Sequence, residues 1–206
     1  MLKLWGRTSS INVRKVLWTL QAIGVPFERV DAGLSFGIVK TPDYLVKNPN
    51  AMIPLLEDGD FSLWESNVIV RYLCAKYANG TLYPKSIQQQ FDAERWMDWQ
   101  QTTLNNASRD AFYHWIRVKP ELRNHASIAK SVADTEPLLQ MIDNQLSSRA
   151  YLAGDHLTMA DIPIACEIHR WWGLPQPRPA FVHIERWYTQ MLAHPASRGV
   201  LDLPLA

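Results

Sequence analysis

The chain has 206 residues, 47% of them hydrophobic, and its 21 basic and 20 acidic residues give a net charge of +1. This length is enough for one large core or two small ones. The balanced charge argues against nucleic acid or an anionic membrane as partner, and no apolar run approaches the roughly 18 residues of a spanning helix. We therefore expect a cytoplasmic protein with a small-molecule partner.

The first 80 residues alternate between strand and helix patterns. Leu2–Trp5 alternates like a strand, and apolar residues recur at helical spacing over 13–23 before Gly24, which suits a helix C-terminus. Phe27–Val30 predicts the second strand. A strand, helix and strand in sequence imply a right-handed crossover, so these two strands should be parallel. This half is predicted to be an α/β domain with thioredoxin-like order.

A hairpin and a helix start follow. Asp58–Gly59 predicts a type I′ turn between two short apolar runs, and Ser66 begins the next helical pattern. Pro54 cannot donate to a strand ladder. If its peptide bond is cis, Ile53 presents its backbone N–H and C=O to an outside partner, and Glu65 and Ser66 lie nearby at a helix N-terminus that favours anions. The pattern predicts a peptide-binding site built mostly from backbone.

A second candidate site lies where the first strand meets the first helix. Thr8, Ser9, Ser10 and Asn12 precede or begin a helix whose N–H groups and dipole favour a negative charge. The alternative interpretation is an ordinary helix N-cap.

The remainder of the chain is predicted to be helical. The segment from Asn79 to about Ser86 carries linker signals, so we divide the chain into domains 1–80 and 87–206. Long helical patterns run over 88–118 and 121–146, and Pro137 is expected to kink the second or to end its first part.

Two further signals concern folding. Thr158 with Asp161 three residues later fits a capping box at a buried helix start, and a last helix is expected from Phe181 to Met191. Cys74 and Cys166 show no metal-ligand or redox spacing and are expected in the core, so we predict no metal site.

The Ile53–Pro54 pair, the hairpin, and Glu65–Ser66, placed after a strand and a Ser-rich helix start, resemble the glutathione-binding half of soluble glutathione transferases. The resemblance covers essentially the whole chain. It implies a thioredoxin-like N-terminal domain and an all-helical C-terminal bundle. It also implies that Pro54 is cis, that Ile53 pairs with the cysteinyl backbone of glutathione, and that Glu65 and Ser66 hold the γ-glutamyl end.

The same resemblance implies which group contacts the glutathione sulfur. No tyrosine precedes Tyr44 and no cysteine precedes Cys74, so Tyr- and Cys-dependent versions have no candidate at the first corner. The run from Ser10 to Val13 is similar to the Ser-x-Asn-Val of phi-type enzymes. Ser10 is the preferred thiolate donor and Asn12 the second catalytic candidate, with Thr8 and Ser9 as alternatives.

Further site residues follow from the resemblance or from helical spacing. Lys40 is similar to the lysine that pairs with the glycyl carboxylate, whereas Met52 departs from the polar Gln of phi-type enzymes. Arg109, Phe112 and Trp115 are expected to line an electrophile pocket between the domains, with His114 and the Trp171–Trp172 pair as further candidates and core packing as the alternative.

The resemblance implies a homodimeric detoxification enzyme that conjugates glutathione, as a substrate and without another cofactor, to small hydrophobic electrophiles. Glutathione-dependent reduction of peroxides or disulfides, isomerisation and dehalogenation are alternatives, and so is a non-catalytic interaction module with the same fold.

Overall fold

The computed structural model describes residues 1–206. A four-stranded sheet in the order β2-β1-β3-β4 forms the first part of the chain. β1 pairs with β2 in parallel, whereas β1 with β3 and β3 with β4 are antiparallel. A parallel pair beside an antiparallel hairpin is the predicted arrangement. The strands are β1 (Leu2–Trp5), β2 (Phe27–Val30), β3 (Leu55–Asp58) and β4 (Phe61–Trp64).

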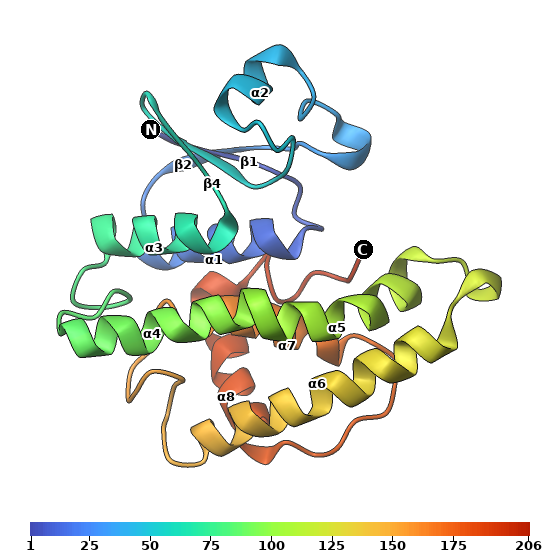
Figure 1. Cartoon of the computed structure of the whole chain (residues 1–206). Helices are drawn as coiled ribbons and strands as arrows, with labels where there is room; N and C mark the ends of the chain where they lie inside the picture. The colour runs from blue at the N-terminus through green and yellow to red at the C-terminus, as the bar shows by residue number, and fades with distance from the viewer.

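Helices cover both faces of this sheet. α1 (Ile11–Ile23) and α3 (Ser66–Tyr77) lie between the sheet and the second half of the chain, and α2 (Pro42–Lys47) lies on the opposite side (Figure 1). α1 packs against α3 on one side and against α7 (Asp161–Trp172) on the other. The N-terminus of α1 is therefore held between the two halves of the molecule.

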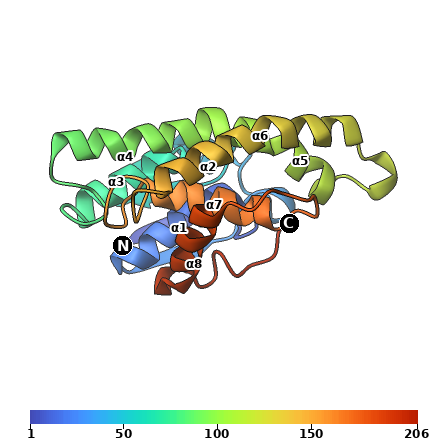
Figure 2. The ribbon, with the colours of Figure 1, turned by 90° about the horizontal axis from the view of Figure 1, so that it is seen from below.

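The second half is helical, which confirms the predicted fold class. Viewed from below, α5 and α6 lie side by side, and the chain passes from α7 to α8 before its C-terminal segment (Figure 2). No helix is both long and apolar enough to cross a membrane. The helices are α4 (Ile87–Trp99), α5 (Asn105–Phe112), α6 (His125–Leu146), α7, and α8 (Val182–Ala193), with short 3₁₀ turns at Leu34–Phe36, Pro120–Leu122 and Pro195–Ser197.

The long helical patterns differ in detail from the prediction. The helix expected over 88–118 contains two π-helical turns, Gln100–Leu104 and Tyr113–Arg117. α6 begins later than expected because Asn124 caps it, its side-chain oxygen accepting from the Ser127 N–H at 3.0 Å. The helix also continues through Pro137, so the prediction that Pro137 ends its first part is wrong. Its apolar face past the proline is buried in the core, and this packing outweighs the lost backbone bond.

The hairpin turn is displaced by one residue from its predicted place. Asp58 pairs with Phe61, so the two-residue loop is Gly59–Asp60 rather than Asp58–Gly59. Gly59 has φ +63°, but Asp60 does not have a positive φ. A type I′ turn needs positive φ at both central residues, so the predicted turn type is wrong.

One continuous cluster of 40 buried apolar residues runs through both halves. Trp18 of α1 and Trp187 of α8 are both fully buried in it. Both cysteines are free and buried, as expected. Because the core crosses the interface, α1 is fixed relative to the helical domain. The division into 1–80 and 87–206 stays a prediction.

Candidate functional site

A groove of about 330 Å³ opens at the end of the sheet, between the hairpin and the start of α1. It brings together most of the residues expected to bind the tripeptide. Its lining consists of Asn12, Asn48, Asn50, Met52, Ile53, Pro54, Trp64, Glu65 and Ser66.

Ile53 contributes unpaired backbone to this groove. The Ile53–Pro54 peptide bond is cis, as the sequence resemblance implies. The ladder between β3 and β1 begins only at Leu55, and neither the N–H nor the C=O of Ile53 has a partner within the protein. Ile53 packs against the segment between β1 and α1 because Gly6 in that segment has no side chain. A Cβ on Gly6 would lie 2.4 Å from Val13 and 3.4 Å from Ile53.

The segment leading to Ile53 is fixed by hydrogen bonds to one carbonyl. The Tyr44 hydroxyl and the Asn48 amide both donate to the Met52 oxygen, at 2.6 and 2.8 Å. Burial raises the pKa of Tyr44 to about 12, so this donor keeps its proton. The Met52 side chain is 63% exposed at the groove. Lys40 is exposed and does not border the groove, so the structure does not bring it to this site.

Glu65 and Ser66 form the far wall of the groove. Glu65 has φ +73°, a strained conformation for a residue other than glycine. Its carboxylate accepts from the Gln101 side chain at 2.9 Å, so the helical domain helps to orient it. Ser66 is the first residue of α3, only 4% exposed, and its hydroxyl has no partner within the protein. A free hydroxyl and free N–H groups at a helix start are suited to an anionic group.

Ser10 lies at the N-cap of α1, but its side chain makes no capping hydrogen bond. Its hydroxyl is therefore free to donate outward. Ser9 and Ser10 border a second cavity of about 90 Å³, on the helical-domain side of α1. The remaining lining residues are Arg7, Ile11, Arg14, Phe112, Arg117, Cys166, His169, Arg170, Leu205 and Ala206.

Only one of the three predicted electrophile-pocket residues reaches this cavity. Phe112 lines it. Arg109 is not among the lining residues and pairs with Asp110 at the surface, and Trp115 lies under Arg123. Of the further candidates, His114 accepts from the Asn124 N–H, Trp171 is buried in the core, and Trp172 packs on Phe181 and Tyr188.

The thiol and imidazole that border the cavity are not reactive groups. Burial raises the pKa of Cys166 to about 12, so its thiol stays protonated. Burial lowers the pKa of His169, and both of its ring nitrogens are engaged, with the Tyr188 hydroxyl at 3.0 Å and the Leu203 carbonyl at 2.9 Å. No group of three or more His, Cys, Asp and Glu side chains is placed to hold a metal ion.

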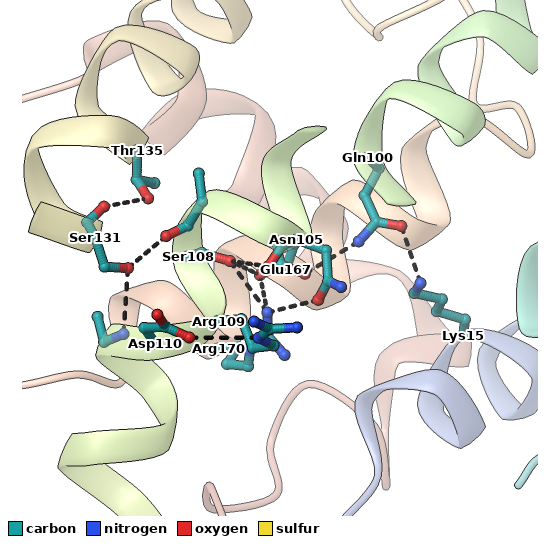
Figure 3. A network of polar contacts seen from close by, with 12 residues as sticks. Lys15, Gln100, Asn105, Ser108, Arg109, Asp110, Ser131, Thr135, Glu167 and Arg170 are labelled. Atoms are coloured by element: carbon teal, nitrogen blue, oxygen red, sulfur yellow. Dashed lines mark hydrogen bonds and ion pairs between the residues drawn. The ribbon is translucent and has the colours of Figure 1, made fainter. Parts of the chain in front are cut away.

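A buried polar network joins α1 to the helical domain beside the cavity (Figure 3). Lys15 donates to Gln100 at 2.9 Å, and Gln100 donates to Glu167 at 3.0 Å. Glu167 also accepts from Ser108 and pairs with Arg170. Gln100 belongs to the first π-helical turn, so this irregularity places a polar side chain in the domain interface.

The buried Lys15 makes stability depend on pH. Desolvation by burial lowers its pKa from 10.5 to about 8, against the attraction of Glu167. Between these values the unfolded chain binds a proton that the folded chain does not, so stability rises with pH. We expect wild type to gain about 1 kcal/mol relative to Lys15→Met between about pH 7 and pH 9.

Urea unfolding of both proteins at several pH values measures this difference. Lys130→Met, at an exposed position paired with Asp134, is the matched control and should follow wild type. Parallel curves for wild type and Lys15→Met would contradict the assignment.

Sequence reasoning missed the charged side of the cavity. Arg7, Arg14, Arg117 and Arg170 come from four separate segments, and only their packing brings them together. The one local signal was Arg7, which follows Gly6 directly after the first strand.

The site and the fold define a class of protein. A mixed sheet offers a strand edge and a helix N-terminus to a peptide, and a free hydroxyl next to that groove faces a cavity of the helical domain. This is the arrangement of a thioredoxin-like domain with a peptide-sized groove and an added helical domain.

The comparisons narrow the class to one family. The model of the glutathione S-transferase N-terminal domain matches residues 1–75, and that of the C-terminal domain matches residues 107–195. The chain is 40% identical to the glutathione S-transferase GstB of Escherichia coli K12, with both chains covered completely. It is 34% identical to glutathione S-transferase 3 of Zea mays, covering 99% of this chain and 95% of the relative.

A solved structure agrees with these relatives. The theta-class glutathione S-transferase of Xanthomonas axonopodis pv. citri, solved with glutathione bound, has a TM-score of 0.94 and 39% identity, with 98% of each chain covered. The chain belongs to the glutathione S-transferase family, and the identification of a glutathione transferase from the sequence is confirmed.

Proposed function

We propose that this protein binds glutathione in the groove and conjugates its sulfur to a small electrophile held in the cavity next to Ser10. The observation that carries the proposal is a pair of unused hydrogen-bonding groups at one corner. The backbone of Ile53 and the hydroxyl of Ser10 have no partner within the protein, and they border two hollows that each have lining residues at the start of α1.

The groove has complementary groups for a tripeptide thiol. Ile53 supplies one donor and one acceptor for the central residue of an extended peptide. The start of α3 with Ser66 suits a carboxylate, and the Glu65 carboxylate suits an ammonium group. A γ-glutamyl group carries both charges on one carbon, which is why we assign that end of glutathione to this wall.

The chemistry needs a thiolate. A free thiol has a pKa of about 8.5, so only a few per cent is ionised at neutral pH. In the proposed mechanism Ser10 donates a hydrogen bond to the sulfur, and the α1 dipole favours the negative charge. The sulfur then attacks an electrophilic carbon held in line with it.

A pH titration of the thiolate absorbance of bound glutathione tests this proposal directly. We expect bound glutathione to ionise near neutral pH and chlorodinitrobenzene to be conjugated. Glutathione that binds with its ordinary thiol pKa would contradict the mechanism, and absence of binding would contradict the proposed function. The homodimer, the detoxification role and the cytoplasmic location remain predictions. A measurement of the mass in solution tests the predicted homodimer.

Glu65→Ala should weaken glutathione binding. The ammonium group of the ligand would lose a charged acceptor, so we expect Kd to rise by about tenfold. Calorimetric titration of wild type and variant measures the change. Glu28→Ala is the control, because Glu28 lies in β2 away from the groove and pairs loosely with Lys3 at 3.6 Å. An unchanged Kd in Glu65→Ala would remove Glu65 from the site.

A further inference from the structure

We propose that the electrophile taken by this protein carries a carboxylate, which binds to Arg7 and Arg117 in the cavity next to Ser10. The inference rests on the proposed function and names the class of second substrate for the same site.

The cavity is strongly cationic. Four arginines line it, and no Asp or Glu side chain does. Two of the four are already engaged. Arg14 donates to the backbone carbonyls of Thr8, Leu203 and Pro204. Arg170 pairs with Glu167 in the buried network, although its Nε is buried with no partner.

The other two arginines pair with no Asp or Glu side chain. The Arg7 side chain makes no hydrogen bond within the protein, and its Nε is buried and unsatisfied. Arg117 donates to a backbone oxygen of Ala206, the last residue of the sequence, which also lines the cavity. Arg7 and Arg117 line the same cavity of about 90 Å³. Burial lowers the pKa of Arg7, and the charge of Arg117 lowers it further. A half-buried guanidinium with one buried, unsatisfied N–H group gains hydrogen bonds when an anion binds beside it.

The backbone makes room for Arg7 at this position. Gly33 has φ +82°, and a Cβ on it would lie 2.9 Å from Arg7 Nη1 and 3.3 Å from Ile53. The Arg7 guanidinium therefore lies next to the residue that we expect to hold the cysteinyl part of glutathione. An anion bound by Arg7 would be held near the sulfur.

The remaining walls suit a small apolar body attached to that anion. Ile11, Phe112 and Leu205 are apolar lining residues. The centroid of the Phe112 ring also lies 5.5 Å from the Arg117 guanidinium and 4.9 Å from that of Arg170, so both cations pack against this ring. The cavity thus offers a bidentate carboxylate site with an apolar wall between it and Ser10.

A matched pair of electrophiles tests the proposal. The acid is a chloronitrobenzoate with chlorine para to the carboxylate, and the control is its neutral amide. In both, the thiolate sulfur forms a bond to the ring carbon that bears chlorine, and chloride leaves with the bonding electron pair. The thiol proton passes to solvent when the thiolate forms. Each catalysed rate is divided by the uncatalysed rate with glutathione, because the two rings differ in intrinsic reactivity.

We expect this rate enhancement to be at least about tenfold greater for the acid than for the amide. Arg117→Gln and Arg7→Gln should each lower the ratio of the acid's rate enhancement to the amide's about tenfold. The cause would be a higher KM for the acid. Arg117 is exposed, so its variant should fold even if the Arg7 variant does not. The control is Arg95→Gln, because Arg95 pairs with Asp92 on the surface of α4 and should leave the ratio unchanged.

The outcomes separate this inference from the proposed function. Conjugation of chlorodinitrobenzene with equal enhancement for acid and amide would overturn the carboxylate site and leave the proposed function standing. If Arg117→Gln loses as much affinity for glutathione as for the acid, the carboxylate site is also overturned. Arg117 would then bind a carboxylate of glutathione and not one of the electrophile. Failure to conjugate any of the three electrophiles would overturn both.

Discussion

Ser10→Ala is expected to reduce turnover about tenfold to a hundredfold and to raise the thiol pKa of bound glutathione by about one to two units. This is roughly the free energy of one hydrogen bond to a charged sulfur. The fold should be little affected, because the Ser10 side chain makes no capping bond. The backbone bonds at this corner, from the Arg14 N–H to the Ser10 carbonyl at 3.0 Å and from the Ser10 N–H to the Arg7 carbonyl at 3.2 Å, do not involve it. Thiolate absorbance as a function of pH, with glutathione saturating, measures the effect.

Neighbouring variants separate Ser10 from the other groups at this corner. Ser9 borders the same cavity and Asn12 borders the groove, so Ser9→Ala and Asn12→Ala are matched controls. We expect both to keep the depressed thiol pKa. If Asn12→Ala loses it and Ser10→Ala does not, the Asn12 amide is the donor and the assignment of Ser10 is wrong.

The groove could be predicted from the sequence because its signals are local. A proline that cannot join a ladder, a serine before a helix and an acidic residue at a helix start each report on a few neighbouring residues. The pairing of β1 with β3 then brings Ile53, Ser66 and Asn12 to one groove. The predicted place of the hairpin turn was wrong by one residue. The local sequence allows the loop to begin at Asp58 or at Gly59, and the pairing of Asp58 with Phe61 selects the second.

The cavity could not be predicted in the same way, because helical spacing fails across a π-helical turn. Such a turn adds a residue and changes the facing direction by about 100°, the rotation of one residue in an α-helix. Arg109 follows the first π-helical turn, and Trp115 lies within the second. Trp115 is therefore turned away from the face that a regular helix predicts. Arg109 and Phe112 both lie in α5, and only Phe112 lines the cavity, so spacing within a helix does not by itself select the residues that reach it. Arg7 and Arg117 are separated by more than half of the chain, and only the packing of α1 against the helical domain brings them to one cavity.

Asp161→Ala should be the most destabilising single substitution considered for this protein, with a loss on the order of 4 kcal/mol in the free energy of unfolding. Asp161 is fully buried at the start of α7. One carboxylate oxygen accepts from the Leu152 N–H at 3.0 Å and from Trp187 Nε1 at 2.9 Å. The other accepts from the Thr158 N–H at 2.9 Å, which is the reciprocal bond of a capping box. Alanine would leave these three buried donors unpaired.

Two further variants show whether these bonds carry the stability. Burial raises the pKa of Asp161 to about 6, so at neutral pH the group is mostly an ionised acceptor. Asp161→Asn keeps one acceptor oxygen but turns an amide N–H toward one of the donors, so its loss should lie between zero and that of Asp161→Ala. Asp134→Ala removes an exposed carboxylate paired with Lys130 and should change stability by no more than about 0.5 kcal/mol. Equal losses for Asp134→Ala and Asp161→Ala in urea unfolding would mean that the capped start of α7 does not stabilise this fold.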